Sequence, residues 1–186
     1  MNCNIFFTSD THFHHTNVIK YCTRPFTTRK GDEIIPDVNW MNREMTRRWN
    51  ETVSPLDTVY HLGDFAMGSS SLLAPTRRKL NGKIILIKGN HDRSVQALLN
   101  AGFDQVYNQL NMELDGVKLY LHHQPEVKER WNQATIHLCG HVHEKWRRKG
   151  NMINVGVDQW DFTPRTLKEI LAAEKQGVWP TPEEME

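Results

Sequence analysis

The sequence predicts an α/β fold with strands of mixed direction, and three observations support this prediction. Short apolar runs alternate with longer helical patterns along the 186 residues. Most of the runs are continuously apolar, as expected for strands that are covered on both faces. The pair Asp115-Gly116 separates two strand-like runs and predicts a tight hairpin, so at least one strand pair should be antiparallel.

The predicted strands are short apolar runs that end at polar or glycine-containing segments. They are Asn4–Ser9, Thr58–Leu62, Lys83–Lys88, Val117–His122, Ile136–Cys139 and Met152–Val155, with Met112–Leu114 as the first arm of the hairpin. Sites in such sheets form beyond the carboxyl ends of the strands, so the residues that follow each run are the first candidates for function.

Four segments predict helices, each from a local signal. In Val38–Val53, apolar side chains recur four residues apart and form a stripe. Ser70–Leu80 has a weaker pattern because it contains Pro75. Ser94–Ala101 has a capping serine at its start and a glycine after its end. Thr166 and Glu169 form a capping-box pattern that opens a last helix, which should reach about Gln176.

Length and composition indicate one domain, which we place at residues 1–177, followed by a frayed tail over 178–186. A net charge of +1 gives no global electrostatic case for binding nucleic acid or a membrane surface. No apolar run approaches the length of a membrane span, and nothing resembles a signal peptide. Three unpaired-looking cysteines argue against a disulfide framework, so we expect a reducing, cytoplasmic location.

Five polar motifs carry the functional signal, and each follows a predicted strand. They are Asp10-Thr11-His12, Gly63-Asp64, Gly89-Asn90-His91-Asp92, His122-His123-Gln124-Pro125 and Gly140-His141-Val142-His143. Each motif alone is a weak signal. Together, at the ends of successive strands, they place carboxylate, amide and imidazole groups where one site can form.

The donor atoms in these motifs are oxygen and nitrogen, with no thiolate. This set suits two divalent ions, manganese first, with iron, nickel, zinc or magnesium as alternatives. Asp64 stands alone after its strand, and a carboxylate can bridge two cations where a histidine cannot. Two ions about 3.5–4 Å apart lower the pKa of a bridging water and clamp the oxygens of an in-line phosphoryl displacement.

In this order, the five motifs resemble those of the calcineurin-like metallophosphoesterases, from about Ile5 to Asp161. The segments Phe13–Phe26 and Asn154–Asp158 are most similar to a branch of small bacterial and phage members. The resemblance implies two facing mixed β-sheets flanked by helices, a four-layer α/β/β/α sandwich with the site at the shared edge. It also implies that a hydroxide bridging two metal ions attacks the phosphorus.

The resemblance also implies two ligand sets and a catalytic histidine. One metal would be held by Asp10, His12, Asp64 and His143, and the other by Asp64, Asn90, His123 and His141. His91 matches the histidine that protonates the leaving oxygen or stabilises the transition state. Two positions depart from the family pattern. Met67 stands where many members have the carboxylate that orients this histidine, and His122 precedes the ligand His123 where a serine or cysteine is usual.

Further residues beside the motifs are candidates for binding substrate. His15, Asn17 and Arg24 fit the branch pattern, and an arginine near the metals could hold a phosphate with two hydrogen bonds. The basic run 145–149 could guide a polyanion and stack a base on Trp146. The alternative, which we favour for that run, is a solvated turn.

The sequence therefore predicts a metal-dependent phosphoric ester hydrolase, with a small phosphodiester or a nucleotide as the favoured substrate. A nuclease is the second candidate, although related nucleases usually add a capping domain that is absent here. A protein phosphatase is third, because the segment 63–68 lacks the arginine of that branch. A catalytically silent binding module is the competitor from another class. The oligomeric state stays open.

Overall fold

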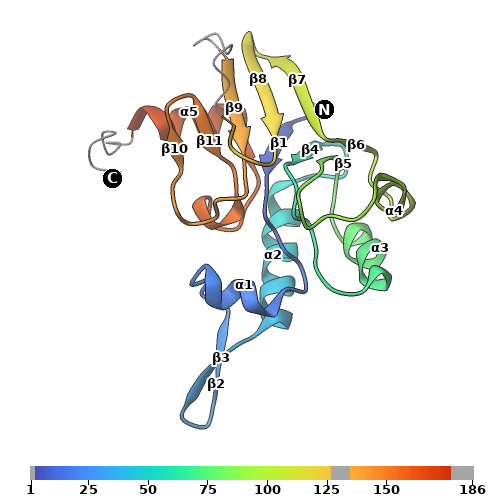
Figure 1. Cartoon of the computed structure of the whole chain (residues 1–186), viewed down its shortest axis with the longest axis vertical. Helices are drawn as coiled ribbons and strands as arrows, with labels where there is room; N and C mark the ends of the chain where they lie inside the picture. Colours follow the sequence, from blue (N-terminus) through green and yellow to red (C-terminus); the bar gives the residue numbers. More distant parts are fainter. Residues whose placement is uncertain (1–2, 127–134, 177–186) are drawn as a thin grey trace.

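The computed structural model describes residues 3–126 and 135–176. It contains two five-stranded sheets, and the first sheet has the strand order β12-β1-β4-β5-β6. Strands β1 (Ile5–Thr8), β4 (Thr58–His61), β5 (Lys83–Ile87) and β6 (Gln105–Tyr107) run parallel, and β12 (Arg165–Thr166) pairs antiparallel with β1. The carboxyl ends of β1, β4 and β5 therefore meet at one edge (Figure 1).

The second sheet has the order β10-β11-β9-β8-β7. Its members are β10 (Arg148–Lys149), β11 (Met152–Asn154), β9 (Thr135–Cys139), β8 (Val117–His122) and β7 (Gln109–Leu114). The three central strands are parallel and both outer pairs are antiparallel. The predicted hairpin at Asp115-Gly116 joins β7 to β8, so the expected mixed α/β fold is confirmed.

Apolar residues on successive positions of a strand pack on opposite faces of the first sheet, as the pleat requires. On the outer face, Phe6 and Val59 belong to a buried cluster shared with the helices. On the inner face, Phe7 and Leu62 join the second sheet in another cluster, which includes Leu119, Leu121, Leu138 and Ile153. The two sheets thus face each other across a continuous apolar layer.

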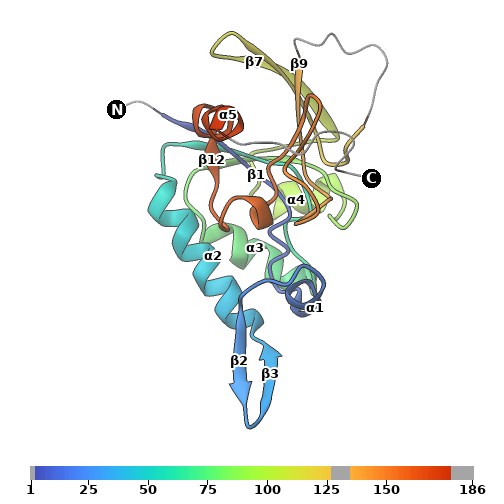
Figure 2. The ribbon, with the colours of Figure 1, turned by 90° about the vertical axis from the view of Figure 1, so that its left-hand side faces the viewer.

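Three helices cover the outer face of the first sheet: α2 (Val38–Thr52), α3 (Ser70–Arg78) and α4 (Val95–Asn100) (Figure 2). The predicted stripe of α2 is buried through Met41, Met45 and Trp49. Helix α3 forms with Pro75 inside it. Helix α5 (Leu167–Gln176) starts with the predicted capping box and adds Leu167 and Ile170 to the layer between the sheets.

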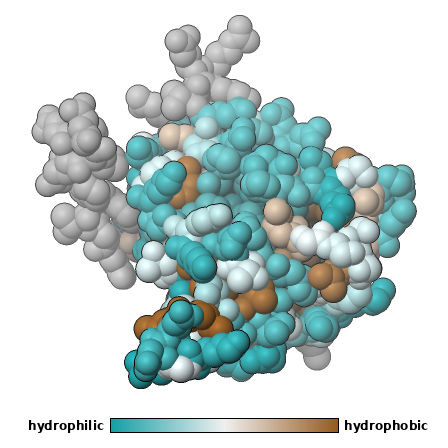
Figure 3. Space-filling model, turned by 60° about the horizontal axis from the view of Figure 1, so that its bottom comes forward, coloured by the Kyte–Doolittle hydropathy of each residue, from teal (hydrophilic) through white to brown (hydrophobic). Residues whose placement is uncertain are grey.

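Several short elements were not predicted. They are the helix α1 (Thr16–Tyr21), the hairpin of β2 (Thr27–Lys30) and β3 (Glu33–Pro36), the short strands β6, β10 and β12, and a 3-10 turn at Val157–Gln159. The hairpin projects from the body beyond α2 (Figures 1 and 2). Tilting this end forward shows a mostly hydrophilic face with hydrophobic side chains in small, separate groups (Figure 3).

Among residues 3–126 and 135–176, no helix is long and apolar enough to cross a membrane. The predicted frayed tail over 178–186 lies outside the described residues. Helix α5 extends to Gln176, as the capping-box argument predicted.

Candidate metal centre

The site residues lie just beyond the carboxyl ends of strands from both sheets. In the first sheet, Asp10 follows β1, Asp64 follows β4 and Asn90 follows β5. In the second sheet, His123 follows β8, and His141 and His143 follow β9. Backbone hydrogen bonds join these loops. The Asp10 N–H donates to Gly63 O at 3.0 Å, and the Gly140 N–H donates to His123 O at 2.9 Å. All five motifs therefore converge on the shared edge of the two sheets.

Five of the seven predicted ligands have a left-handed backbone, with φ between 47° and 70°. They are Asp10, His12, Asp64, His141 and His143. This conformation is uncommon outside glycine, and strain of this kind costs on the order of 1–3 kcal/mol per residue. Such strain concentrates at functional sites.

Two motif glycines are needed because a carboxylate packs directly against their backbone. A Cβ atom at Gly89 would collide with the carboxylate of Asp64. A Cβ atom at Gly140 would collide with the carboxylate of Asp10. The glycines of the third and fifth motifs thus allow the loops to close around the two aspartates.

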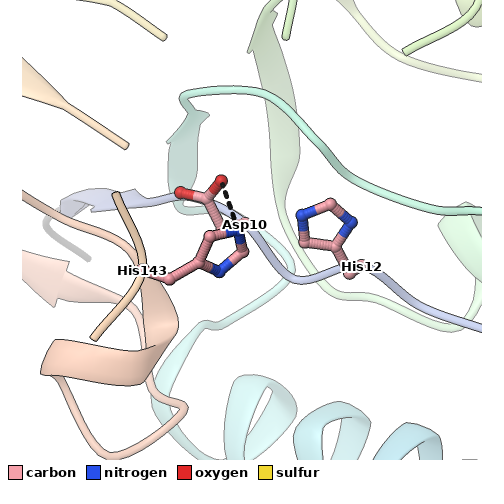
Figure 4. A group of neighbouring side chains, drawn as sticks. All are labelled: Asp10, His12 and His143. Atoms are coloured by element: carbon pink, nitrogen blue, oxygen red, sulfur yellow. Dashed lines mark ion pairs between the residues drawn. The ribbon is translucent and has the colours of Figure 1, made fainter. Parts of the chain in front are cut away.

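The first ligand group consists of Asp10, His12 and His143, whose donor atoms all lie within 4.8 Å of one another. Figure 4 shows the three side chains converging from the loop after β1 and the loop after β9. His143 Nε2 lies 3.9 Å from Asp10 Oδ1, and His12 Nε2 lies 3.5 Å from Asp64 Oδ2. Asp64 therefore stands at the boundary of this group.

The second group consists of Asp10, Asp64 and His123, again with donor atoms within 4.8 Å. His123 Nε2 lies 3.5 Å from Asp64 Oδ2 and 3.0 Å from Asn90 Oδ1. His141 Nδ1 lies 3.1 Å from the same Asn90 oxygen. The structure thus brings all seven predicted ligands together, in two groups that share Asp10, with Asp64 in the second group and 3.5 Å from His12 of the first.

The surroundings of His12 are those expected of a metal ligand. Its side chain is 3% exposed, and neither ring nitrogen has a hydrogen-bond partner among the described residues. Burial lowers the pKa of His12 to about 2, so the ring is neutral and offers lone pairs. Leaving a buried polar group without a partner is costly. A metal ion would supply the missing partner.

In the second group, Asp64 is ionised and suits a cation, whereas His123 holds a proton. Burial alone would raise the pKa of Asp64, but the hydrogen bond and charge of His123 outweigh it and hold the pKa below its usual range. For His123, burial lowers the pKa, and the neighbouring aspartates more than reverse this and raise it to about 9. A metal ion at this site would have to displace that proton.

His91 lies beside the predicted ligands, and no side chain among the described residues holds its ring in place by a hydrogen bond. Its backbone N–H donates to Asp64 Oδ1 at 2.9 Å, and its ring centroid is 5.7 Å from that of His12. Among residues 3–126 and 135–176, the imidazole has no hydrogen-bond partner. The neighbouring Asp92 is used elsewhere, because its carboxylate accepts the backbone N–H groups of Asp64, Phe65 and Gly89.

The expected substrate contacts have different surroundings. His15 faces the site, with its ring centroid 5.4 Å from that of His12. Asn17 is exposed on α1. Arg24 is 3% exposed, and its five donors are all used, so its guanidinium is not free to hold a phosphate.

In the basic run 145–149, Arg147 and Arg148 make contacts within the protein. Arg147 stacks over Trp160 at 4.6 Å and donates to Gln159 O. Arg148 pairs with Glu174 at 3.5 Å, and Arg148 and Lys149 form strand β10. The run is therefore neither a solvated turn throughout nor an open track for a polyanion.

One residue in contact with a predicted ligand was missed as a site candidate: Asp158. Its carboxylate accepts a hydrogen bond from His143 Nδ1 at 3.0 Å and pairs with Arg24 at 2.7 Å. Burial alone would raise the pKa of Asp158, but His143 and Arg24 outweigh it and lower the pKa, which keeps the carboxylate ionised. Cys22 lies beside this pair, and burial raises the pKa of its thiol to about 12. The one sequence signal for Asp158 was its place in the segment Asn154–Asp158, which gave no indication of its partners.

Comparison with known proteins identifies the family of the chain. Residues 3–166 match the calcineurin-like phosphoesterase superfamily domain. An uncharacterized protein of Methanocaldococcus jannaschii is 32% identical over 184 residues, covering 93% of this chain and 92% of that protein. The gene 66 protein of Mycobacterium phage D29 is 27% identical over 209 residues, covering 94% and 99%.

Similarity extends to a solved structure. The crystal structure of a protein of unknown function from Aquifex aeolicus matches with a TM-score of 0.68 and 28% identity, over 92% of this chain and all of that one (100%). With the family match spanning the strands that carry all five motifs, the chain belongs to the calcineurin-like phosphoesterase superfamily.

Proposed function

We propose that this protein is a metal-dependent phosphoester hydrolase that uses two divalent ions and acts on a small phosphodiester or a nucleotide. The observation that carries the proposal is the pair of overlapping ligand groups, with seven oxygen and nitrogen donors and no thiolate among them. Family membership supports the reaction class. The ligand assignment rests on the distances between side chains.

In this proposal, Asp10, His12, Asp64 and His143 hold one ion, and Asp64, Asn90, His123 and His141 hold the other. Two bound ions supply Lewis acidity, which activates water near neutral pH and neutralises charge on phosphoryl oxygens. Manganese is the metal that we expect first, with iron, nickel, zinc and magnesium as alternatives, because carboxylate oxygens suit manganese and magnesium while imidazole suits iron, nickel and zinc.

His91 is the proposed general acid. It is exposed, it adjoins the ligand Asn90, and its backbone is fixed to Asp64. A side chain at the rim of the site can reach the leaving oxygen of a substrate without binding the metals itself. His15, which also lies beside His12, is placed to contact the same substrate.

A small substrate is favoured over a nucleic acid because, over residues 3–126 and 135–176, the arginines considered for a polyanion are engaged within the protein. Two arginines of the basic run are held by Trp160 and Glu174, and Arg24 is buried. A silent binding module is disfavoured because it would have no reason to keep five strained ligand positions and a partnerless buried histidine.

The test is hydrolysis by one purified sample with Mn²⁺. The substrates are a bis-aryl phosphodiester, an aryl phosphomonoester, cyclic nucleotides and single-stranded DNA. We expect turnover of the diester or a cyclic nucleotide, loss of turnover with a chelator and recovery on adding Mn²⁺. Cleavage of DNA alone would favour the nuclease. Absence of turnover on all substrates, in protein that binds Mn²⁺, would favour the binding module.

A further inference from the structure

We propose that the buried Arg24–Asp158 pair is a positioning device for one of the two metal sites, and that it acts by orienting His143. This inference rests on the proposed ligand role of His143 and extends it to two residues that bind no metal themselves. The pair connects the first and last ligand motifs, which are more than 130 residues apart in sequence.

The first step concerns the two ends of the His143 ring. Nδ1 lies 3.0 Å from Asp158 Oδ2, and Nε2 points toward Asp10 at 3.9 Å (Figure 4). An ionised carboxylate only accepts hydrogen bonds, so Nδ1 carries the proton and Nε2 keeps its lone pair for an ion. Metal-binding histidines commonly use a carboxylate in this way, which fixes the tautomer and the ring plane.

The second step concerns what holds Asp158. Arg24 Nε donates to Asp158 Oδ1 at 2.7 Å, and Nη2 donates to Oδ2 at 2.9 Å. This fork fixes the plane of the carboxylate, and the side chains of both residues are at most 3% exposed. His143 therefore donates to an oxygen that has little freedom to move.

The third step concerns the remaining donors of Arg24. Nη2 also donates to Asp10 O at 2.8 Å, and Nη1 donates to Thr11 O at 3.1 Å. Asp10 and His12 have φ values of 57° and 47°, so this segment needs outside support to keep its strained shape. One guanidinium thus holds both the backbone of the first motif and the partner of His143.

The two proposed metal sites differ in what orients their histidines, so the inference predicts an effect on one site alone. His123 is oriented by a backbone group, because its Nδ1 donates to Leu62 O at 2.7 Å. That contact does not depend on any side chain that could be replaced. Loss of Asp158 should therefore affect the site of His143 and spare the site of His123.

A purely structural ion pair is the alternative, and a matched control separates the two. Arg77 and Asp104 form another arginine–aspartate pair at 3.2 Å, less buried than Arg24–Asp158, near the start of β5 and away from every ligand. Asp104→Asn breaks a partly buried arginine pair without touching a motif. Asp158→Asn breaks one as well, and also removes the charge beside His143.

The experiment is calorimetric titration of metal-free protein with Mn²⁺ at fixed pH, together with the Tm of the metal-free form. We expect Asp158→Asn to weaken one of two Mn²⁺ sites by about 10–100-fold and leave the other unchanged. Asp104→Asn should lower Tm without changing either affinity. Unchanged affinities in folded Asp158→Asn, or equal weakening of both sites, would overturn the inference.

If Asp158→Asn does not fold, Arg24→Lys serves as the second variant. Lysine keeps a charge near Asp158 but cannot also hold the two carbonyls, so the same single site should weaken by a smaller factor. Equal effects on both sites would again overturn the inference. Wild-type protein that binds no Mn²⁺ would contradict the proposed function itself, which distinguishes the two failures.

Discussion

At the scale of single residues, His122 and His123 are adjacent but lie in opposite environments. His123 is 2% exposed and its Nε2 faces Asn90 and Asp64. His122 lies on the other face of β8, where its Nδ1 is 3.3 Å from Glu126 and its ring stacks on Tyr120. The alternation of side chains along a strand produces this difference.

We therefore predict that His123→Ala lowers kcat by orders of magnitude and releases one metal ion, whereas His122→Ala retains most activity and both ions. Steady-state kinetics and metal analysis of the two variants, prepared in parallel, measure this directly. The reverse ranking would mean that the alignment of this motif is displaced by one residue.

A second prediction at this scale concerns His91. His91→Ala should keep near-normal metal content and lose about 10²–10⁴-fold in kcat, the usual contribution of a general acid. The loss should be smaller for aryl esters than for esters with an alkoxide leaving group, because aryl oxides need less protonation. Equal losses across leaving groups would assign His91 to charge stabilisation, and an unchanged rate would exclude it from the mechanism.

The candidate ligand residues could be named from the sequence because two local features mark them: a residue type that binds metals and a position at the end of an apolar run. Asp158 and the true environment of Arg24 could not be predicted in this way. Their pairing joins residues 134 apart, and it depends on the two sheets facing each other. For the same reason, the sequence predicted that Arg24 contacts the substrate. The structure shows instead that all its donors are used inside the protein.

At the scale of elements, β4 carries a buried histidine that should make the protein sensitive to acid. His61 is fully buried, near Trp49, with ring centroids 6.4 Å apart, and its Nε2 lies 2.9 Å from Thr11 Oγ1. Burial lowers the pKa of His61 to about 3. The unfolded chain takes up this proton near pH 6.5 and the folded chain does not, so stability falls as pH drops from 6.5 toward 3.

For metal-free protein, we predict that His61 contributes about 1.4 kcal/mol per pH unit to this slope. His61→Gln should therefore show a shallower decline of unfolding free energy between pH 6.5 and 4 than the wild type, measured by urea denaturation. Other buried histidines, such as His12 and His137, keep some slope in the variant. A slope that does not change on substitution would contradict the burial argument.

Most elements that were predicted correctly have a strong local pattern, such as the stripe of α2 and the capping box of α5, and α3 formed in spite of a weaker one. The hairpin of β2 and β3 was missed because its strands are largely exposed and carry no buried face to set a period. Strands β10 and β12 have two residues each, and only tertiary pairing defines them.

At the scale of the whole molecule, the site exists because two mixed sheets share an apolar layer and end at one edge. The first sheet supplies Asp10, His12, Asp64 and Asn90, and the second supplies His123, His141 and His143. Neither sheet alone carries a complete ligand set. Metal ions bound here would bridge the sheets, which links binding to the stability of the fold.

The central claim is that one chain holds two metal ions that share Asp64, and metal stoichiometry tests it most directly. Metal-free protein reconstituted with Mn²⁺, freed of excess ion and analysed by mass spectrometry should contain two ions per chain. Asp64→Asn should lose both metal content and activity. A fully active wild-type protein with a single tightly bound ion, or an Asp64→Asn variant with two ions and full turnover, would contradict the account.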